Sequence, residues 1–424
     1  MGRAQHNLSP HKVKPVMDMS PLVILTHVRH AAVTEGFVPA AHRLGLPVVL
    51  VTDHRLDHLR YYGEQSVNAP SRIIECDVFN PLSVIDALRG AGIRPAAVFS
   101  NSDHLQTATA LVAANFGLPA KDWRVCYAAK NKAAMRERLQ ELGLPTPWFH
   151  SLAPGEELPG DIPWPVIAKP REGVASLDVR LCADAAALRQ HLDAFWQRHP
   201  GRTVLLEAFL EGPLFTLDTL GDGERIEVIG GFEVSLCEPP HFIELEARWN
   251  GDAVRQGRDR ALAQVRAFGV GIGVCHSEFI LAAQGPVLVE INYRSIGDGR
   301  EFMLDRMFDR QWFETILRLH LGERLALPGA ARQHALVRYY VARQEGRLTA
   351  ASADHFHAAP LGHSDYRSLR RAGEDIRLSF SNKDYLGILH VVADDEAALQ
   401  HTLHAAEAGL HWDIATEPTT EAAL

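Results

Sequence analysis

Residues 21–120 alternate short apolar segments with stretches of helical periodicity, and this alternation restricts the fold more than any other feature of the sequence. The apolar segments are "PLVILTH", "PVVLVTD", "SRIIECDV" and "AAVFSN". Strands that are separated by helices pair in parallel, because a crossover connection returns the chain to the same end of the sheet. The sequence therefore predicts an N-terminal, doubly wound α/β domain with a parallel sheet.

Polar residues follow these strands directly. Doubly wound sheets bind ligands at the carboxyl ends of their strands. Each such residue taken singly is more often a cap of the next helix than a ligand contact, so both interpretations stay open. The residues are Thr26, His27, Asp53, Asn101 and Asp103.

The regular alternation of apolar segments and helical stretches ends after this region. The predicted fold class is therefore a multidomain combination of α/β and α+β units. The α/β domain takes residues 21–125, after a mobile tail over residues 1–20. Residues 126–212 begin with the linker helix "NKAAMRERLQELGLPTP" and continue as an α+β lid. Residues 213–328 form a central unit of hairpins and one long helix, and residues 329–424 form a C-terminal α+β unit.

Composition excludes several classes of partner. The chain has 424 residues, 46% of them hydrophobic, and a formal net charge of -9, which argues against nucleic-acid binding. No apolar run of about 18 residues exists, and the opening segment lacks the apolar centre of a secretory signal. The five cysteines form no CxxC pair, which indicates reduced thiols. We therefore predict a cytoplasmic protein with no membrane or nucleic-acid partner; a homodimer is compatible with the sequence.

Two carboxylates occupy neighbouring strands of one predicted hairpin. Glu278 lies in "HSEFIL" and Glu290 in "VLVEIN", and the connection between them is short. Like charges that face each other across a strand pair are unfavourable unless a cation lies between them. Mg2+ accepts few carboxylates plus neutral oxygens, and Asn292 offers one more oxygen on the same strand face. The alternative is a pair of solvated acids at strand ends.

Cationic side chains lie close to this hairpin or end another strand. Arg294 follows Asn292 with the period of two that puts both on one face. Lys169 ends the apolar strand of "WPVIAKP", before a loop with Gly173 and Ser176. An ammonium and backbone N–H groups in such a loop can bind phosphate. Taken alone, Lys169 is equally a solvated lysine, and Lys132 near its helix start is a weaker signal still.

Two other patterns carry no prediction of function. The glycine pattern of residues 269–274 follows a helix and precedes a strand, which is the reverse of a dinucleotide fingerprint, so we expect a loop. His27 and His30 in "HVRH" have no carboxylate at metal-ligand spacing, so a surface or core position is the favoured interpretation.

The order of these motifs resembles the ATP-grasp superfamily, in particular its carboxylate-amine ligases of the L-amino-acid ligase type. The resemblance covers about residues 21–330 and is strongest in "HSEFIL" and "EINYR". It implies an ATP-grasp fold with an N-terminal pre-ATP-grasp domain, ATP as a substrate, and Mg2+, or Mn2+ in its place. It further implies a metal-binding set of Glu278, Glu290 and Asn292, and a catalytic pair of Arg294 and Lys169. The implied ATP-binding residues are Lys132, Lys169, Gly173, Ser176, Glu207, Ala208 and Leu210.

The sequence departs from the family pattern at three positions. Leu214 stands where the family often has an acid that touches ribose, and Tyr293 replaces the common proline of the "EINPR" segment. Glu244 matches a residue that receives a substrate amine, but Ala247 stands where a histidine is usual. These departures indicate a substrate different from that of the best-known dipeptide ligases, with Glu244 and Arg294 as its expected contacts.

The resemblance implies an enzyme that converts a small carboxylate into an acyl phosphate and joins it to an amine. A natural-product or siderophore pathway suits such an amide-forming reaction. One alternative is an ATP-grasp carboxylase or formyl-transferring enzyme of nucleotide metabolism. Another is a nucleotide-binding scaffold without turnover, although such a scaffold needs neither the metal ligands nor Arg294.

Overall fold

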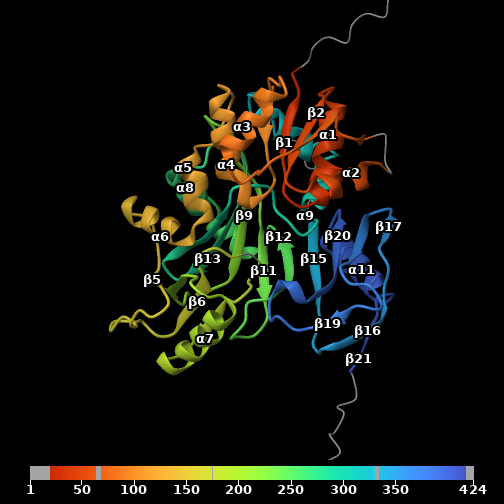
Figure 1. The fold of residues 1–424 in the computed structure, drawn as a ribbon. Coiled ribbons are helices and arrows are strands. Elements are labelled where there is room, and N and C mark those ends of the chain that lie inside the picture. Colours follow the sequence, from red (N-terminus) through yellow and green to blue (C-terminus); the bar gives the residue numbers. More distant parts are fainter. Residues whose placement is uncertain (1–19, 64–67, 174, 328, 330–333, 417–424) are drawn as a thin grey trace, which may run out of the picture.

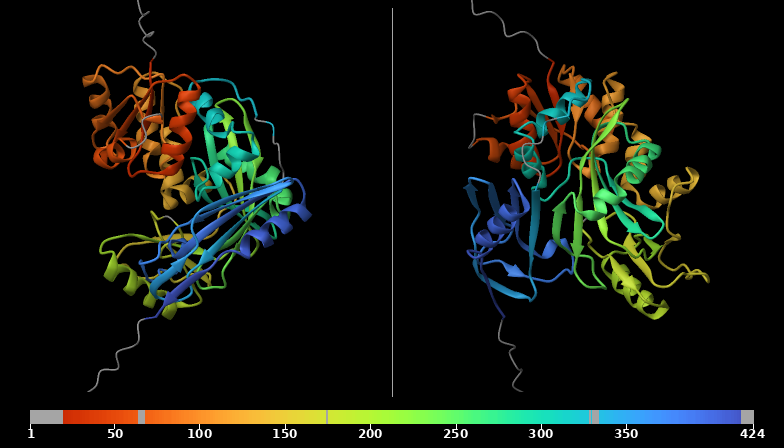
Figure 2. Two further views of the ribbon diagram at one scale, coloured as in Figure 1. Left: turned by 90° about the vertical axis from the view of Figure 1, so that its right-hand side faces the viewer. Right: turned by 180° about the vertical axis from the view of Figure 1, so that it is seen from behind.

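The structure is a computed structural model that describes residues 20–63, 68–173, 175–327, 329 and 334–416. Figure 1 shows the N-terminal domain at one end, with the strands of a large sheet running away from it toward the lid and the C-terminal unit. From the side, the N-terminal domain and the lid stand apart from each other and project to the same side of the central sheet (Figure 2, left). The predicted mobile tail lies outside the described residues, apart from Ser20.

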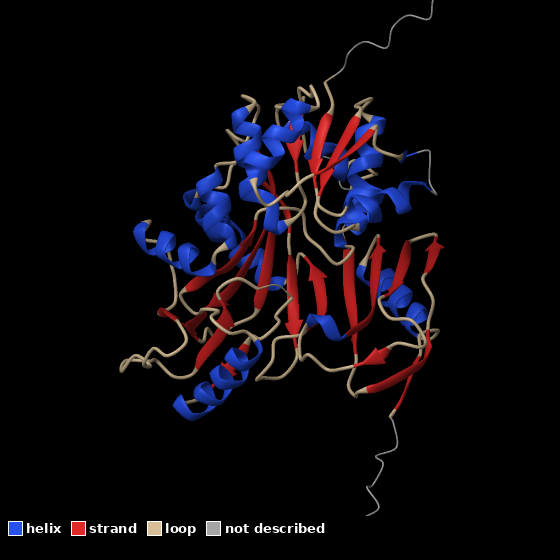
Figure 3. Ribbon diagram, viewed as in Figure 1, coloured by secondary structure: helices blue, strands red, loops and turns tan. Residues whose placement is uncertain are grey.

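The N-terminal domain is a parallel sheet covered by helices, as the alternation predicted. Its strand order is β3-β2-β1-β4, and every pairing is parallel. Strands β1, β2 and β4 are buried throughout, because helices cover both faces of the sheet (Figure 3). The elements are β1 (Leu22–Leu25), η1 (Ala32–Phe37), α1 (Val38–Arg43), β2 (Val48–Thr52), α2 (Arg55–Gly63), β3 (Arg72–Glu75), α3 (Pro81–Gly90), β4 (Ala97–Phe99), η3 (Asp103–Leu105) and α4 (Gln106–Asn115).

The unit expected to be the lid consists of an antiparallel sheet and a helix packed on it. Its antiparallel strands have the order β5-β8-β6-β7, and helix α7 packs its apolar face on them through Leu188, Leu192 and Phe195. Two helices lead into it, and Asn131 caps the second by accepting hydrogen bonds from the N–H groups of Ala133 and Ala134. The elements are α5 (Trp123–Lys130), α6 (Lys132–Glu141), β5 (Phe149–Leu152), β6 (Val166–Pro170), β7 (Arg180–Cys182), α7 (Ala185–Arg198) and β8 (Val204–Ala208).

A 10-stranded sheet forms the centre of the described structure. Strand β13 pairs with both β9 and β14, so it is covered on each edge. The glycine pattern over residues 269–274, which we expected to be a loop, gives its last three residues to β13, because they pair with β9. The elements are β9 (Leu214–Asp222), β10 (Ile226–Gly230), β11 (Phe232–Leu236), β12 (Glu244–Trp249), α8 (Asp252–Phe268), β13 (Ile272–Ala282), β14 (Gly285–Asn292), α9 (Arg300–Met307) and α10 (Trp312–His320).

The same sheet continues into the C-terminal unit. Strand β15 pairs with β12 on one side and with β20 on the other, across the boundary expected at residue 329. This unit therefore extends the central sheet, and a smaller sheet of order β19-β16-β21 accompanies it. The elements are β15 (His334–Val341), β16 (Gly346–Ala351), β17 (His355–Ala359), β18 (Gly362–Ser368), β19 (Asp375–Ile376), η4 (Asn382–Asp384), β20 (Tyr385–Ala393), α11 (Glu396–Glu407) and β21 (Trp412–Ala415).

One hydrophobic core joins the N-terminal domain to the central sheet. The rings of Phe37 and Phe313 meet edge to face with their centroids 4.9 Å apart. Helix η1 comes so close to α10 that a Cβ atom on Gly36 would lie 2.4 Å from Phe313 Cε1, so only glycine fits there. This contact fixes where the carboxyl ends of the parallel strands lie relative to the end of β14.

The structure shows the state of the cysteines and the length of the apolar helices. All five cysteines are free. Burial raises the pKa of Cys126 and of Cys182 to about 11, so both thiols are neutral at neutral pH. Within the described ranges, no helix is long and apolar enough to cross a membrane. The cytoplasmic location stays a prediction.

Candidate active site

Glu278 and Glu290 face each other across the β13–β14 hairpin, as the alternation of the two strands predicted. They are register partners, and the register shifts immediately after them, between Glu278 and Phe279. Burial in the cavity wall, together with the facing charge of Glu290, raises the pKa of Glu278 to about 7. Two carboxylates in this position repel each other, so a bound cation would stabilise the ionised pair.

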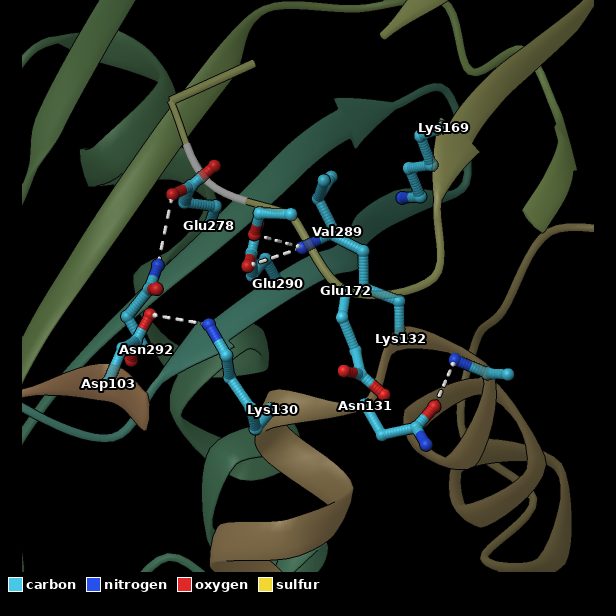
Figure 4. A network of polar contacts seen from close by, with 12 residues as sticks. Asp103, Lys130, Asn131, Lys132, Lys169, Glu172, Glu278, Val289, Glu290 and Asn292 are labelled. Atoms are coloured by element: carbon cyan, nitrogen blue, oxygen red, sulfur yellow. Dashed lines mark hydrogen bonds and ion pairs between the residues drawn. The ribbon is translucent and has the colours of Figure 1, made fainter. Parts of the chain in front are cut away.

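Neighbouring side chains hold both carboxylates in place (Figure 4). Lys132 Nζ lies 2.7 Å from Glu290 Oε1, and Asn292 Nδ2 donates to Glu278 Oε1 over 3.2 Å. The donor set of two carboxylates and one amide oxygen consists entirely of hard oxygens, which fits Mg2+ or Mn2+. Glu278, Glu290 and Asn292 would hold such an ion.

Arg294 lies where the N-terminal domain meets the end of β14. Its Nη2 donates to Asn292 Oδ1 over 3.2 Å, and its Nε lies 3.6 Å from Asp103 Oδ1. Burial alone would raise the pKa of Asp103, but Arg294 and Lys130 outweigh burial and lower it. Asp103, one of the polar residues noted at the strand ends, therefore stays ionised and orients the guanidinium of Arg294.

A cavity of about 170 Å³ lies between the lid and the central sheet. Its walls are largely apolar, and Glu278 and Glu290 lie at its edge. Leu214 also lines it, so the position where the family often has a ribose-binding acid offers a methyl surface here. Every residue of the expected ATP-binding set lines this lid cavity: Lys132, Lys169, Gly173, Ser176, Glu207, Ala208 and Leu210.

Glu207, one of the expected ATP-binding residues, contributes its side chain to the wall of the lid cavity. Its carboxylate lies 2.7 Å from Lys169 Nζ and 2.7 Å from Arg136 Nε, and all three side chains are buried. Burial alone would raise the pKa of Glu207, but the two cations hold it well below its usual range. Arg136, one turn after Lys132 on α6, was missed because a helical arginine in a linker carries no sequence signal.

A second, polar cavity of about 610 Å³ opens on the other side of the carboxylate pair. It is bounded by the strand ends of the N-terminal domain, by the end of β14 and by residues 382–385 of the C-terminal unit. Ser176, Glu244, Glu278 and Glu290 line both cavities, so the polar cavity and the lid cavity meet at these residues. Ala247, by contrast, is fully buried in the core.

Glu244 and Arg300 form the inner wall of the polar cavity. Arg300 Nη2 lies 3.6 Å from Glu244 Oε2, and burial raises the pKa of Glu244. Several buried polar atoms here have no hydrogen-bond partner, namely Arg300 Nε and Nη1, Glu244 Oε2 and the hydroxyl of Tyr385. Buried polar groups are nearly always paired, so atoms left free beside a cavity indicate a polar ligand. Arg300 was missed, although it follows the recognised "EINYR" segment closely.

Asn382 connects the C-terminal unit to the site. Its N–H donates to Ala175 O over 3.1 Å, in the loop that contains Gly173 and Ser176. Its side-chain oxygen accepts from the N–H of Glu244 over 3.1 Å. No sequence pattern points to Asn382, because an asparagine 138 residues from its partner leaves no local signal.

Contacts of two histidines with carboxylates were also missed. His276 Nδ1 lies 3.0 Å from the fully buried Asp218, and its Nε2 lies 4.0 Å from Glu278 Oε1. His27 Nδ1 lies 2.8 Å from both carboxylate oxygens of Asp53. No carboxylate stands at metal-ligand spacing from His27 in the sequence; Asp53 reaches it because parallel pairing of β1 with β2 brings together residues that are distant in sequence.

Solved structures share this architecture over most of their length. An L-amino acid ligase from Bacillus licheniformis has a TM-score of 0.73 at 18% identity, over 94% of this chain and 100% of that one. A phosphoribosylglycinamide synthetase from Anaerococcus prevotii has a TM-score of 0.66 at 14% identity, over 94% and 100%. A biotin carboxylase from Campylobacter jejuni has a TM-score of 0.63 at 15% identity, over 93% and 92%.

Curated relatives match the sequence itself. The uncharacterized protein y4rH of Sinorhizobium fredii is 28% identical over 399 residues, which are 89% of this chain and 80% of that protein. Carnosine synthase 1 of Gallus gallus is 28% identical over 296 residues, 62% of this chain and 31% of that protein. Dapdiamide A synthase of Enterobacter agglomerans is 24% identical over 256 residues, 54% and 59% respectively. The matches therefore span under two thirds of both named synthases.

These comparisons show the fold of the chain. No protein-family model matches the chain. The architecture is nevertheless the ATP-grasp fold that the resemblance implied. The chain thus shares the fold of these enzymes and is similar in sequence to carnosine synthase 1 and dapdiamide A synthase over part of their length.

Proposed function

We propose that this protein is an ATP-dependent ligase that activates a small carboxylate as an acyl phosphate and joins it to an amine. The observation that carries this proposal is the meeting of two cavities at Glu278 and Glu290. The lid cavity is apolar and suits adenine, while the polar cavity suits two small, charged substrates. ATP bound across the carboxylate pair would place its terminal phosphate toward the polar cavity.

The charges around the junction suit phosphoryl transfer. A carboxylate oxygen attacks the terminal phosphorus, the bond to ADP breaks, and an acyl phosphate forms; the amine then attacks the acyl carbon and phosphate leaves. Lys132 and Lys169 bring ammonium groups to the lid cavity, and Arg294 brings a guanidinium to the polar one. A bound Mg2+ supplies charge neutralisation on the phosphates. These fixed cations oppose the negative charge that develops on the transferred group.

The substrates belong to the polar cavity. Glu244 and Arg300 offer a carboxylate and a guanidinium with unpaired atoms, which would contact an ammonium and a carboxylate of small molecules. An amino acid or hydroxy acid as the acid, and a natural-product or siderophore pathway, are the finer parts of the proposal. The names carnosine synthase, dapdiamide A synthase and L-amino acid ligase among the relatives support an amide product. A cytoplasmic location, with ATP at hand, belongs to the same proposal.

The test is ADP release against a panel of carboxylates and amines, followed by trapping with hydroxylamine. Enzyme, ATP, Mg2+ and the right acid should give a hydroxamate of that acid, because hydroxylamine intercepts the acyl phosphate. Adding the right amine should replace the hydroxamate by an amide. Turnover that yields ADP and amide without any trappable acid derivative would contradict the acyl-phosphate route.

A carboxylase is the second candidate, because biotin carboxylase shares the fold over most of both chains. A carboxylase would require bicarbonate and fix it into product. ADP release that depends on bicarbonate and ignores every organic acid would favour this candidate over the ligase. The absence of ADP release under any combination of substrates would favour a nucleotide-binding scaffold.

A further inference from the structure

His27, Asp53 and His54 bring three ligand atoms together at one corner of the N-terminal domain. Each offers one imidazole nitrogen or carboxylate oxygen, and the three atoms lie within 4.8 Å of one another. The residues follow β1 and β2, which are adjacent parallel strands, so the sheet itself brings them side by side. Of the three, His27 lines the polar cavity, whereas Asp53 and His54 lie outside its lining.

The hydroxyl of Thr52 holds together the two segments that carry His27 and His54. Thr52 Oγ1 donates to His27 O over 3.0 Å and accepts from the N–H of His54 over 3.0 Å, and Thr52 is fully buried. His58 Nε2 donates to the same carbonyl of His27 over 3.2 Å. The rings of His27 and His54 meet edge to face at 4.5 Å between centroids. Ligand-bearing segments held in this way need little reorganisation to bind an ion.

The chemistry of the trio differs from that of the Mg2+ set. Imidazole nitrogens favour Zn2+, Co2+ or Ni2+, whereas Mg2+ favours oxygen alone. Three protein ligands leave at least one coordination position for a further ligand. His27 lines the polar cavity, and its side chain is 34% exposed, so an ion bound to it would lie at the cavity rim.

We propose that His27, Asp53 and His54 form a binding site for a divalent transition metal at the rim of the polar cavity. Metal binding would replace the direct contact between His27 Nδ1 and the carboxylate of Asp53. The competing explanation is a plain hydrogen-bonded pair of His27 with Asp53, with His54 merely nearby. The two explanations differ in whether the trio retains a metal ion.

The experiment is Zn2+ titration of the metal-stripped full chain by calorimetry, with excess Mg2+ present to fill the carboxylate site. One Zn2+ per chain should bind to the wild-type protein, and His54→Ala and Asp53→Asn should each weaken this binding at least tenfold. Replacing Zn2+ by Co2+ should give the visible absorption of a nitrogen-ligated ion in the wild type, and this absorption should weaken in His54→Ala and Asp53→Asn. His104→Ala is the matched control, because His104 lines the same cavity outside the trio, and it should bind as the wild type does.

The outcomes separate this site from the ligase activity, because no ATP, acid or amine is present. Equal Zn2+ affinity in wild type, His54→Ala and Asp53→Asn would overturn the proposal, as would the absence of Zn2+ binding in the wild type. Thermal unfolding followed by circular dichroism identifies a variant that has lost its fold. Because the side chain of His54 is 40% exposed, its replacement should change unfolding little, which keeps the test decisive.

Discussion

Lys132 Nζ lies 2.7 Å from Glu290 Oε1, so an ammonium from the linker helix pairs with one of the two carboxylates that face each other across the β13–β14 hairpin. The exposed fractions of the two side chains are 8% and 23%. Lys132 also lines the lid cavity. One lysine thus compensates the charge of the carboxylate pair and presents a cation to the proposed phosphate position.

This pair should show strong energetic coupling. In a double-mutant cycle of Lys132→Met and Glu290→Gln, we expect a coupling free energy of about 2 kcal/mol, because either single change leaves the other partner uncompensated in a poorly solvated place. Urea unfolding of the four proteins measures it. The exposed pair of Arg248 and Glu396 is the control and should give a coupling close to zero. Equal coupling in both cycles would contradict the prediction.

Mg2+ binding should weaken in acid because of Glu278. Its raised pKa of about 7 means that the neutral form prevails below that pH, so Mg2+ must displace a proton. The dissociation constant for Mg2+ should rise about tenfold per pH unit below about 7 and level off above it. Calorimetry across this range measures the change, and Glu278→Gln should bind weakly without this slope. An identical slope in that variant would assign the proton to another group.

The raised pKa of Glu278 has the opposite effect on the stability of the metal-free protein, which falls as the pH rises. The folded chain keeps a proton on Glu278 that the unfolded chain releases near 4.5. Without Mg2+, this residue therefore lowers the free energy of unfolding progressively as the pH rises from about 4.5 to about 7. Saturating Mg2+ should remove the effect, because the ion stabilises the ionised form.

Arg294→Lys should lower kcat and leave the KM for ATP nearly unchanged. The substitution keeps the charge but loses the planar fork that contacts Asn292 and Asp103. Because Arg294 lines the polar cavity and not the lid cavity, the defect should appear in the hydroxamate yield. Arg318→Lys, at an exposed position on α10, is the control. A rise in the KM for ATP with an unchanged kcat would place Arg294 on the nucleotide side.

Asn382→Ala should lower kcat/KM for the acid about tenfold, which corresponds to losing roughly one hydrogen bond. The side chain holds Glu244, while the backbone contact with Ala175 survives the substitution. ATP binding, measured by fluorescence in the absence of acid, should change little. Asn115→Ala, at an exposed helix end, controls for a general effect of removing an amide. A defect confined to ATP binding would show that Asn382 acts through the loop alone.

Glu207→Gln should destabilise the protein by about 3–5 kcal/mol, because it leaves Arg136 and Lys169 buried without their counter-ion. The depressed pKa of Glu207 means that its contribution is full above the ordinary carboxyl pKa and is lost as the pH falls toward about 2. Chemical unfolding at neutral pH measures the difference. Glu396→Gln, in an exposed ion pair, should leave stability nearly unchanged. A similar loss in both variants would contradict a special role of burial.

The sequence by itself determined those relationships that a short stretch of chain contains. The pairing of Glu278 with Glu290 followed from two alternating strands and one tight turn, and the position of Asn292 followed from the period of two. The parallel N-terminal sheet likewise followed from strands separated by helices. Strand and helix periods fix which side chains share a face, whatever the rest of the chain does.

Only the tertiary structure decided which distant side chains meet. Asp103 lies beside Arg294, Glu207 between Arg136 and Lys169, and Asp53 beside His27, because separate elements pack against one another at those points. No local period encodes such contacts: they depend on the docking of the N-terminal domain on the central sheet and on the position of the lid. The division into a lid cavity and a polar cavity arises in the same way, since no single segment forms either wall alone.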